Sequence, residues 1–453
     1  MSASPLGALL EPALVAARPR RTGRVVRVVG LSFEVEGVDA AIGDAVAVHT
    51  GAEPLLGEVV ALSERGPVAM PFGEMRGIRI GAEVEPLGSP PGIPVGDVLL
   101  GRVLDGLGRP LDEGPRLDHL PRVSTTGTPP HPLQRQPVDR PLRLGVRALD
   151  AVVPCGRGQR LGIFAGSGVG KSSLLSMIVR GTDADVAVLA LVGERGREVR
   201  EFIDHDLGPE GLARSVVVVA TSDAPALMRL QAAYTATRIA EAFRDEGRNV
   251  VLMMDSLTRF CMAQREIGLS SGEVPATRGY PPSVFGLLPR LLERAGSGAT
   301  GSITGLYTVL VDGDDMNEPI GDAARSILDG HIVLSRDLAH AGHFPSIDVL
   351  PSVSRVAPAI TTAEQREAAT ELRALLAAHR EARDLIEIGA YVPGTNPMVD
   401  RAVDRLGAIN GFLRQGMHEP AVAPEPDGST DPARLWEDLH RAIGWQIPTG
   451  AAS

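Results

Sequence analysis

Hydrophobic and polar residues alternate in short runs through residues 24–86 of the chain. The runs RVVRVV, LSFEVEG, DAVAVH and LLGEVVAL are separated by Gly, Asp and Pro. Alternation with a period of two buries one face of a strand and leaves the other in water, and short strands at close spacing are typical of small antiparallel barrels. The pattern predicts an N-terminal β-barrel domain over residues 22–90. The connector that ends it, PLGSPPGIPVG, is too rich in Pro and Gly to continue a strand.

The pattern changes near residue 160. Five mostly apolar runs, RLGIFA, DVAVLALVGE, SVVVVATS, NVVLMMDS and GSITGLYTVLV, lack polar alternation, and helical stretches such as APALMRLQAAYTATRIAEAFRDEG lie between them. Strands that helices cover on both faces have this pattern. We therefore predict an α/β domain with a parallel sheet over residues 91–360. From residue 361 to residue 453, Ala, Leu, Arg and Glu recur at helical spacing, which predicts a C-terminal helical domain.

Composition narrows the class of protein. A chain of 453 residues, 43% of them hydrophobic, suits a folded protein of about three domains. No apolar run reaches the length of about 18 residues that a membrane-spanning helix needs, and the first residues lack the pattern of a secretory signal. Two cysteines, Cys155 and Cys261, are too few for a disulfide framework and fit a reducing cytoplasm. The net charge of −11 argues against broad nucleic-acid binding, which needs a basic face, but leaves room for a local basic patch.

A glycine-rich bend, FAGSGVGKSSLL, lies between a predicted strand and a predicted helix. In such a bend several backbone N–H groups converge at the positive end of the helix, and glycines let an anion approach closely. We predict that the bend binds ATP, with Lys171 reaching the terminal phosphates and the Ser172 hydroxyl binding Mg²⁺. The usual eight-residue pattern begins with Gly, whereas this one begins with Ala. The predicted nucleotide-binding residues of the bend are Ala165, Gly166, Ser167, Gly168, Val169, Gly170, Lys171, Ser172 and Ser173.

Two other strand ends carry charged residues. In NVVLMMDS, five apolar residues precede Asp255, which we expect at the carboxyl edge of the sheet as a magnesium ligand; a helix cap is the alternative. In LALVGERGREVREF, Glu194 and Arg195 follow another buried strand. Their spacing alone does not favour either of two interpretations: a catalytic pair beside the phosphates, or an ordinary solvated ion pair.

Several long segments carry a family resemblance. LVGERGREVREF, MMDSLTRFCMAQREIGL, PATRGYPPSVFGLLPRLLERAG, VDGDDMNEPIGDAARSILDGHIVLSRDLA and IDVLPSVSRV resemble the flagellar and virulence type III export ATPases, which are relatives of the catalytic subunits of rotary ATP synthases. The resemblance covers residues 24–403. It implies a RecA-like ATPase domain, a homohexameric ring, and Mg-ATP bound between neighbouring subunits.

The resemblance also implies roles for individual residues. Asp255 would hold magnesium through water, and Glu194 would polarise the attacking water. Arg195 and Arg259 match positions close to the active site. Arg355 matches an arginine finger that reaches the site of the adjacent subunit, where a guanidinium stabilises transition-state charge. Without the resemblance, Arg355 would be interpreted as one half of a surface salt bridge.

Weaker matches leave alternatives open. Tyr391 falls where the relatives place an aromatic ring near the adenine, and it is equally well part of the core of the helical domain. Asp314 and Asp315 resemble a loop at the subunit interface, or an ordinary turn rich in Asp and Asn. RGYPPSVFGLLPRLLERAG would direct a helix toward the ring axis, or would simply be a core helix that begins with two prolines.

The segment RDLIEIGAYVPGTNPMVDRAV, followed by GFLRQG, favours the flagellar branch. We expect an ATP hydrolase of the flagellar export apparatus, cytoplasmic and peripherally associated with the inner-membrane export gate. The partners implied are a flagellar export regulator, a central stalk-like protein, export substrates and their chaperones. Residues 1–21, a weakly amphipathic segment, would dock the regulator.

Each alternative function requires sequence features that can be looked for in this chain. A virulence-type ATPase and a rotary synthase subunit remain the nearest alternatives, although the acidic patch of the synthase β subunit's helical domain is missing. A non-catalytic ring subunit would lack Glu194. An RNA translocase of the Rho type would need a basic, aromatic platform, whereas residues 24–86 contain only Phe33 and Phe72 as aromatics. The loop PEPDGSTDP departs from both export branches.

Overall fold

A computed structural model describes residues 21–51, 53–311, 318–423 and 430–445. The predicted partner-docking segment, apart from Arg21, lies outside the described residues, as do Asp314, Asp315 and much of the PEPDGSTDP loop. The described chain forms two compact units. The first contains the residues up to Pro91 with Pro225–Met228 and Glu266–Val274, and the second contains Gly92–Ala224, Arg229–Arg265 and the residues from Pro275 onward.

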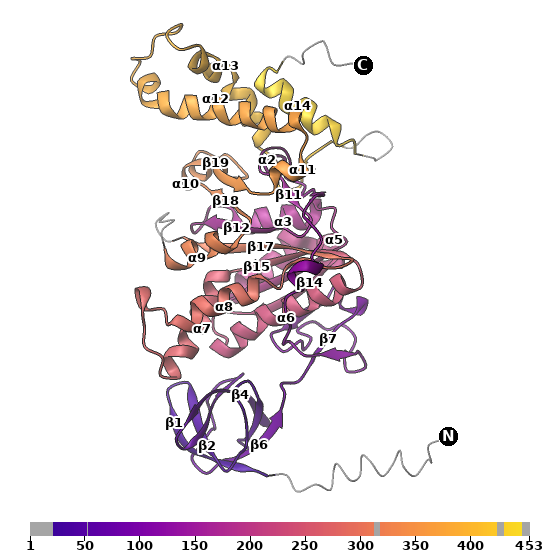
Figure 1. Ribbon diagram of the computed structural model, residues 1–453, viewed down its shortest axis with the longest axis vertical. Coiled ribbons are helices and arrows are strands. Elements are labelled where there is room, and N and C mark those ends of the chain that lie inside the picture. The colour runs from indigo at the N-terminus through magenta and orange to yellow at the C-terminus, as the bar shows by residue number, and fades with distance from the viewer. Residues whose placement is uncertain (1–20, 52, 312–317, 424–429, 446–453) are drawn as a thin grey trace, which may run out of the picture. The chain divides into compact units, whose positions relative to one another are not determined.

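The first unit is built on a closed barrel with the strand order β1-β2-β5-β4-β3-β6 (Figure 1). Its core consists of residues that alternate along the strands, such as Val25, Val35, Val46 and Val48, all 1% exposed or less. The predicted barrel is therefore confirmed. The strands are β1 (Gly23–Val29), β2 (Ser32–Glu36), β3 (Ala45–His49), β4 (Pro54–Ser63), β5 (Gly66–Pro71) and β6 (Glu83–Gly88).

The second unit contains a nine-stranded sheet. Its central strands are parallel and buried apart from some of their end residues, and each corresponds to one of the apolar runs of the sequence. The hydrogen-bonded order is β19-β18-β12-β17-β15-β13-β14-β8, and β16 pairs with β17. The strands are β8 (Val103–Asp105), β12 (Arg160–Ala165), β13 (Val186–Val192), β14 (Ser215–Ala220), β15 (Asn249–Asp255), β16 (Gly296–Ser297), β17 (Ser302–Leu310), β18 (Gly330–Leu334) and β19 (Ile347–Ser354).

The α/β fold class is confirmed, but the sheet is not wholly parallel. The edge strand β19 runs antiparallel to β18, and β16 runs antiparallel to β17. Two-residue strands form two further small pairs, β7 (Ile93–Pro94) with β9 (Arg122–Val123), and β10 (Pro141–Leu142) with β11 (Cys155–Gly156).

One group of helices alternates with the strands of the sheet along the chain, and a second group forms the C-terminal region. Those of the sheet region are α2 (Arg147–Val152), α3 (Lys171–Gly181), α4 (Gly196–Glu201), α5 (Gly208–Ala213), α6 (Ala226–Asp245), α7 (Leu257–Ser270), α8 (Pro282–Leu292), α9 (Pro319–Ile327), α10 (Arg336–His340) and α11 (Ala357–Ile360). Among the described residues, none of the helices combines the length and the apolar character needed to cross a bilayer.

The C-terminal helices α12 (Ala363–Glu387), α13 (Pro397–Leu413) and α14 (Ala433–Ile443) lie side by side (Figure 1). Thr362 and Gln365 form a capping box that fixes the start of α12, because each side chain accepts a backbone N–H of the other residue. Leu372 and Leu439 are buried in the same core as Leu149 of α2. The helical region therefore shares a hydrophobic core with the nucleotide-binding region.

A buried ion pair fixes α6 against the segment after α8. Glu241 accepts hydrogen bonds from Arg294 at 2.7 and 2.8 Å, and the two side chains are 1% and 4% exposed. We expect Glu241→Leu to lower the free energy of unfolding of this unit by about 3–5 kcal/mol, because it leaves the Arg294 charge buried without its partner. The shift of the urea unfolding midpoint measures this loss, and Glu246→Leu, at an exposed position just beyond the same helix, is the control. An unchanged midpoint in Glu241→Leu would contradict the expectation.

Candidate active site

The glycine-rich bend lies between β12 and α3, as predicted. Ala165 is the last residue of β12 and Lys171 the first of α3. Gly168 and Gly170 have φ angles of 76° and 87°, in the left-handed region that a residue with a Cβ rarely adopts. Gly170 is the N-cap of α3, and no side chain caps this helix. The N-terminus of α3 therefore presents free N–H donors and a partial positive charge to an anion.

Lys171 lies between two carboxylates. Its Nζ atom donates to Asp255 Oδ1 at 2.6 Å and to Glu194 Oε1 at 3.2 Å. Thr308 Oγ1 also donates to Asp255 Oδ1, at 2.7 Å. The side chains of Lys171 and Asp255 are 14% and 6% exposed. The structure therefore brings together residues at or just beyond the carboxyl ends of β12, β13 and β15, since parallel strands deliver these ends to one edge of a sheet.

Burial and neighbouring charge shift the pKa values of this group. Burial raises the pKa of Glu194, and the Asp255 carboxylate raises it further, while Lys171 acts in the opposite direction. Burial lowers the pKa of Lys171, but the two carboxylates outweigh it and raise that pKa above its ordinary value. Lys171 is therefore charged at neutral pH, and Glu194 is a stronger base than a solvated glutamate. A raised carboxyl pKa suits a group that accepts a proton from water.

The predicted arginines near the site differ in burial. Arg259, on α7, packs against Gly193, where a Cβ atom would lie 2.9 Å from the Cβ of Arg259. Its Nε atom is buried and has no hydrogen-bond partner among the described residues. Arg195 is the N-cap of α4, and its side chain is 78% exposed and pairs with Glu198 at 3.2 Å. Arg259 therefore lies directly beside the strand end that carries Glu194, whereas Arg195 is solvated.

Arg355 lies at the opposite edge of the sheet. It follows β19, whose last residue, Ser354, pairs with Gly330 at the start of β18. Because β18 is parallel to β12, this position is at the amino-terminal edge, whereas the phosphate loop follows the carboxyl end of β12. The six residues of β12 separate the two edges by about 20 Å. Within one subunit, Arg355 is therefore far from Lys171.

Tyr391 is not brought to the phosphate loop. Its hydroxyl oxygen lies 2.9 Å from Asp400 Oδ1 and 3.1 Å from the Asn396 carbonyl oxygen, and its single proton is donated to one of these acceptors at a time. The tyrosine lines a hollow of about 530 Å³ formed by residues between positions 378 and 399. Its contacts therefore belong to the helical region.

A different aromatic residue, which the sequence analysis missed, lies at the loop. Phe344 is 46% exposed, and a Cβ atom at Gly170 would lie 3.4 Å from its ring. The buried Ser346 donates to the Val169 carbonyl oxygen at 2.5 Å, which ties this segment to the loop. The segment is more than 170 positions from the loop in sequence, so no local pattern indicates the contact.

The donors for a metal ion are few. Ser172 is exposed at the start of α3, and Asp255 is the nearly buried carboxylate beside Lys171. No group of three or more His, Cys, Asp or Glu side chains among the described residues could hold a metal ion. A hydroxyl with one carboxylate fits Mg²⁺ that arrives with phosphates, because Mg²⁺ keeps most of its waters and takes few protein ligands.

Family models match most of the chain. The nucleotide-binding domain of the ATP synthase alpha/beta family matches residues 145–354, and the beta-barrel domain of the same family matches residues 25–88. The T3SS EscN ATPase C-terminal domain matches residues 361–425.

Individual proteins are similar over nearly their whole length. The chain is 53% identical to the flagellum-specific ATP synthase of Bacillus subtilis (strain 168), over 90% of this chain and 93% of that protein. It is 51% identical to the SPI-2 type 3 secretion system ATPase of Salmonella typhimurium, over 89% and 90% of the two chains. Among solved structures, the assembled ATPase EscN of enteropathogenic E. coli matches with a TM-score of 0.86 and 46% identity, over 93% of this chain and 100% of that chain. EscN in complex with its central stalk EscO matches with a TM-score of 0.84.

The position of Phe344 predicts its contribution to nucleotide binding. We expect Phe344→Ala to weaken ATP binding about tenfold, because a stacked aromatic ring is worth about 1–3 kcal/mol per base, and Phe344→Tyr to keep the affinity. Tyr391→Ala should leave the affinity unchanged and serves as the matched control. Titration with a fluorescent ATP analogue measures all three. Weakened binding in Tyr391→Ala, with Phe344→Ala unaffected, would reverse the assignment.

Proposed function

Because the chain belongs to the flagellar and type III secretion ATPases of the ATP synthase alpha/beta family, we propose that it hydrolyses Mg-ATP at seams between identical subunits and uses this reaction in flagellar protein export. The observation that carries the proposal is the separation of functional groups within one subunit. The phosphate loop, Asp255 and Glu194 meet at one edge of the sheet, and Arg355 is exposed at the other. A second subunit is needed to bring both sets of groups to one nucleotide.

The residues at the carboxyl edge of the sheet have different roles in hydrolysis. The N-terminus of α3 and Lys171 bind the phosphates, and Lys171 exchanges its two carboxylate partners for phosphate oxygens. Ser172 and Asp255 would hold Mg²⁺, which neutralises phosphate charge when it is bound. Glu194, released from Lys171, orients the attacking water and accepts its proton. Arg259, which packs against Gly193, would stabilise the negative charge that develops.

Arg355 would act in trans, on the nucleotide bound by the neighbouring subunit. A guanidinium from the neighbouring subunit adds positive charge only when the seam closes, and such a group raises kcat by about 10³–10⁵. The exposed position of Arg355 at the end of the edge strand β19 suits this role. Hydrolysis would then depend on assembly, and reopening of the seam would transmit motion to the helical region.

Several observations support the export branch. The match of residues 361–425 to the T3SS EscN ATPase C-terminal domain favours an export ATPase over a rotary synthase subunit. The relatives of the flagellar and virulence branches are similarly close, at 53% and 51% identity. The assignment to the flagellar branch therefore rests on the amino-acid sequence of the segment around Tyr391. Retention of Glu194 beside Lys171 favours a catalytic subunit over a non-catalytic one.

The proposed partners follow from the relatives. EscN is described as assembled and in complex with a central stalk, which supports a homohexameric ring with a stalk-like partner for this chain. We extend the proposal to a regulator, export substrates with their chaperones, and a cytoplasmic position at the membrane export gate.

The dependence of hydrolysis on assembly is the test. We expect the ATPase activity per subunit to rise steeply with protein concentration, because each active site needs Arg355 from a neighbour, and we expect Arg355→Ala to lose about 10³-fold or more in kcat at every concentration. Arg441→Ala, which removes an arginine that is also exposed, is the control. A flat activity per subunit, or an Arg355→Ala variant as active as the wild type, would overturn the seam mechanism.

A further inference from the structure

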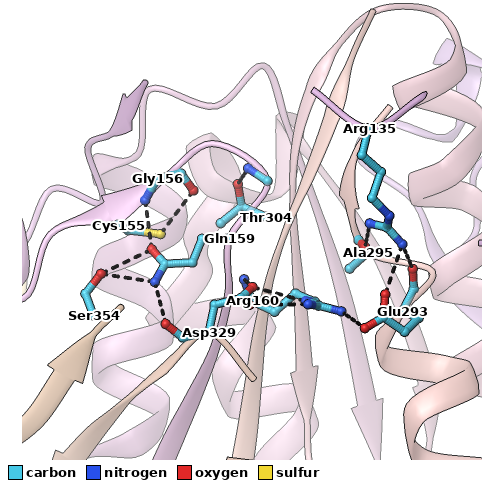
Figure 2. Close-up of polar contacts among 11 residues, drawn as sticks. Arg135, Cys155, Gly156, Gln159, Arg160, Glu293, Ala295, Thr304, Asp329 and Ser354 are labelled. Atoms are coloured by element: carbon cyan, nitrogen blue, oxygen red, sulfur yellow. Dashed lines mark hydrogen bonds and ion pairs between the residues drawn. The ribbon is translucent and has the colours of Figure 1, made fainter. Parts of the chain in front are cut away.

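A cluster of polar side chains occupies the amino-terminal edge of the sheet (Figure 2). It joins the segment before α2, the start of β12, the segment after α8, and the residues that precede β18 and Arg355. We call it the edge cluster. Its members are Arg135, Gln159, Arg160, Glu293, Asp329 and Ser354.

Asp329 is the centre of the edge cluster. Its Oδ2 atom accepts hydrogen bonds from the Arg160 backbone N–H at 3.0 Å and from Arg160 Nε at 3.1 Å, and its Oδ1 atom accepts one from Arg160 Nη2 at 3.2 Å. Two parallel bonds from one guanidinium to one carboxylate fix the orientation of both groups. The main-chain carbonyl oxygen of Asp329 accepts the Arg355 N–H at 3.0 Å. One residue therefore joins the start of β12 to the backbone of Arg355.

Gln159 strengthens the same connection. This side chain is fully buried, and its Nε2 atom donates to the Asp329 carbonyl oxygen at 3.1 Å and to Ser354 Oγ at 3.0 Å. Its Oε1 atom accepts the Gly156 N–H at 2.9 Å. The backbone of Arg355 is therefore held through its own N–H and through the preceding residue, Ser354. Its guanidinium remains exposed and donates to the Arg325 carbonyl oxygen at 3.2 Å.

Arg160 is itself held on two sides (Figure 2). Its Nη1 atom donates to Glu293 Oε1, and Glu293 also accepts a bond from Arg135 at 3.1 Å. The Arg160 side chain is only 15% exposed. Burial lowers the pKa of Arg160, but Asp329 and Glu293 outweigh it and raise that pKa above its ordinary value. The guanidinium that orients Asp329 is therefore permanently charged and has little freedom to turn.

We propose that Asp329 and Arg160 are positioning residues, which hold Arg355 in the orientation that reaches the nucleotide of the neighbouring subunit. The inference deepens the proposed function and rests on it, because it needs Arg355 to act in trans. The edge cluster is about 20 Å from its own phosphate loop, across the length of β12. Its loss therefore impairs hydrolysis in the neighbour's site and leaves ATP binding in its own site intact.

The first test separates kcat from KM. Asp329→Asn keeps the side-chain shape and the carbonyl oxygen but loses the charge that orients Arg160. We expect kcat to fall about 10²-fold, the effect of misplacing a catalytic group by about 1 Å, with an unchanged KM for ATP. Asp118→Asn, which breaks an exposed Asp–Arg pair, is the matched control and should behave as the wild type. An unchanged kcat in Asp329→Asn overturns the proposal.

The second test asks in which subunit the defect acts. Full-length Asp329→Asn and Glu194→Gln chains, with different affinity tags, are co-expressed and co-purified as mixed assemblies. The first has an intact ATP site and the second an intact finger, so seams that combine them should restore activity to at least about tenfold above the mean of the two variants alone, given the large contribution of a finger. Asp329→Asn mixed with Arg355→Ala should show no recovery, because both lack a working finger.

The outcomes distinguish the two proposals. If Arg355→Ala mixed with Glu194→Gln shows no recovery, the trans finger of the proposed function fails. If that mixture recovers and the mixture of Asp329→Asn with Glu194→Gln does not, the positioning role alone is overturned. Recovery in the mixture of Asp329→Asn with Arg355→Ala also overturns it. Should Asp329→Asn fail to fold, Arg160→Lys, which keeps the charge but loses the parallel bonds, enters the same mixtures with the same expected results.

Discussion

The contact of the Lys171 ammonium with the carboxylates of Asp255 and Glu194 determines what the sheet edge can bind. Two carboxylates at this depth repel each other and lose hydration, and the ammonium between them offsets only part of these costs, since the pKa of Glu194 stays raised. The same ammonium lies at the first residue of α3, where free N–H groups already favour an anion. In the proposed mechanism, phosphate oxygens therefore replace the carboxylates as partners of Lys171, and the two carboxylates become available for a metal ion and for water.

The sheet places Arg355, the proposed arginine finger, at the edge opposite the phosphate loop of its own subunit. Parallel strands gather the phosphate loop, Glu194 and Asp255 at their carboxyl ends, whereas the antiparallel edge strand β19 returns the chain to the amino-terminal edge, where Arg355 follows its last residue. Asp329 and Arg160 fix that end to the start of β12. Since β12 begins at the edge cluster and ends at the phosphate loop, one strand joins the proposed finger of one seam to the nucleotide site of the next.

Local sequence patterns predicted the parts of the molecule that depend on local physics. The barrel strands, the buried parallel strands and the glycine bend each follow from periodicity or backbone freedom, and the charged residues at strand ends follow from the rule that parallel strands align their carboxyl ends. The contacts of Phe344 and Asp329 could not be predicted in this way, because each joins segments far apart in the chain. The reversal of β19 could not be predicted either, because the periodicity of a strand does not give the direction in which it pairs. Tyr391 shows the converse: its sequence position allowed either a nucleotide contact or a place in the helical domain, and its hydroxyl contacts Asn396 and Asp400 in the helical region.

The catalytic role of the carboxylates beside Lys171 is tested most directly by the Glu194→Gln variant. Its rate of phosphate release is compared with its affinity for ATP. If Glu194 accepts the proton of the attacking water, release should fall by about 10²–10⁴-fold while ATP binding is retained, because the amide keeps the shape of the site. Glu201→Gln, at an exposed position on the following helix, should match the wild type. Equal rates of phosphate release in Glu194→Gln and the wild type would contradict a catalytic role for this cluster of charges.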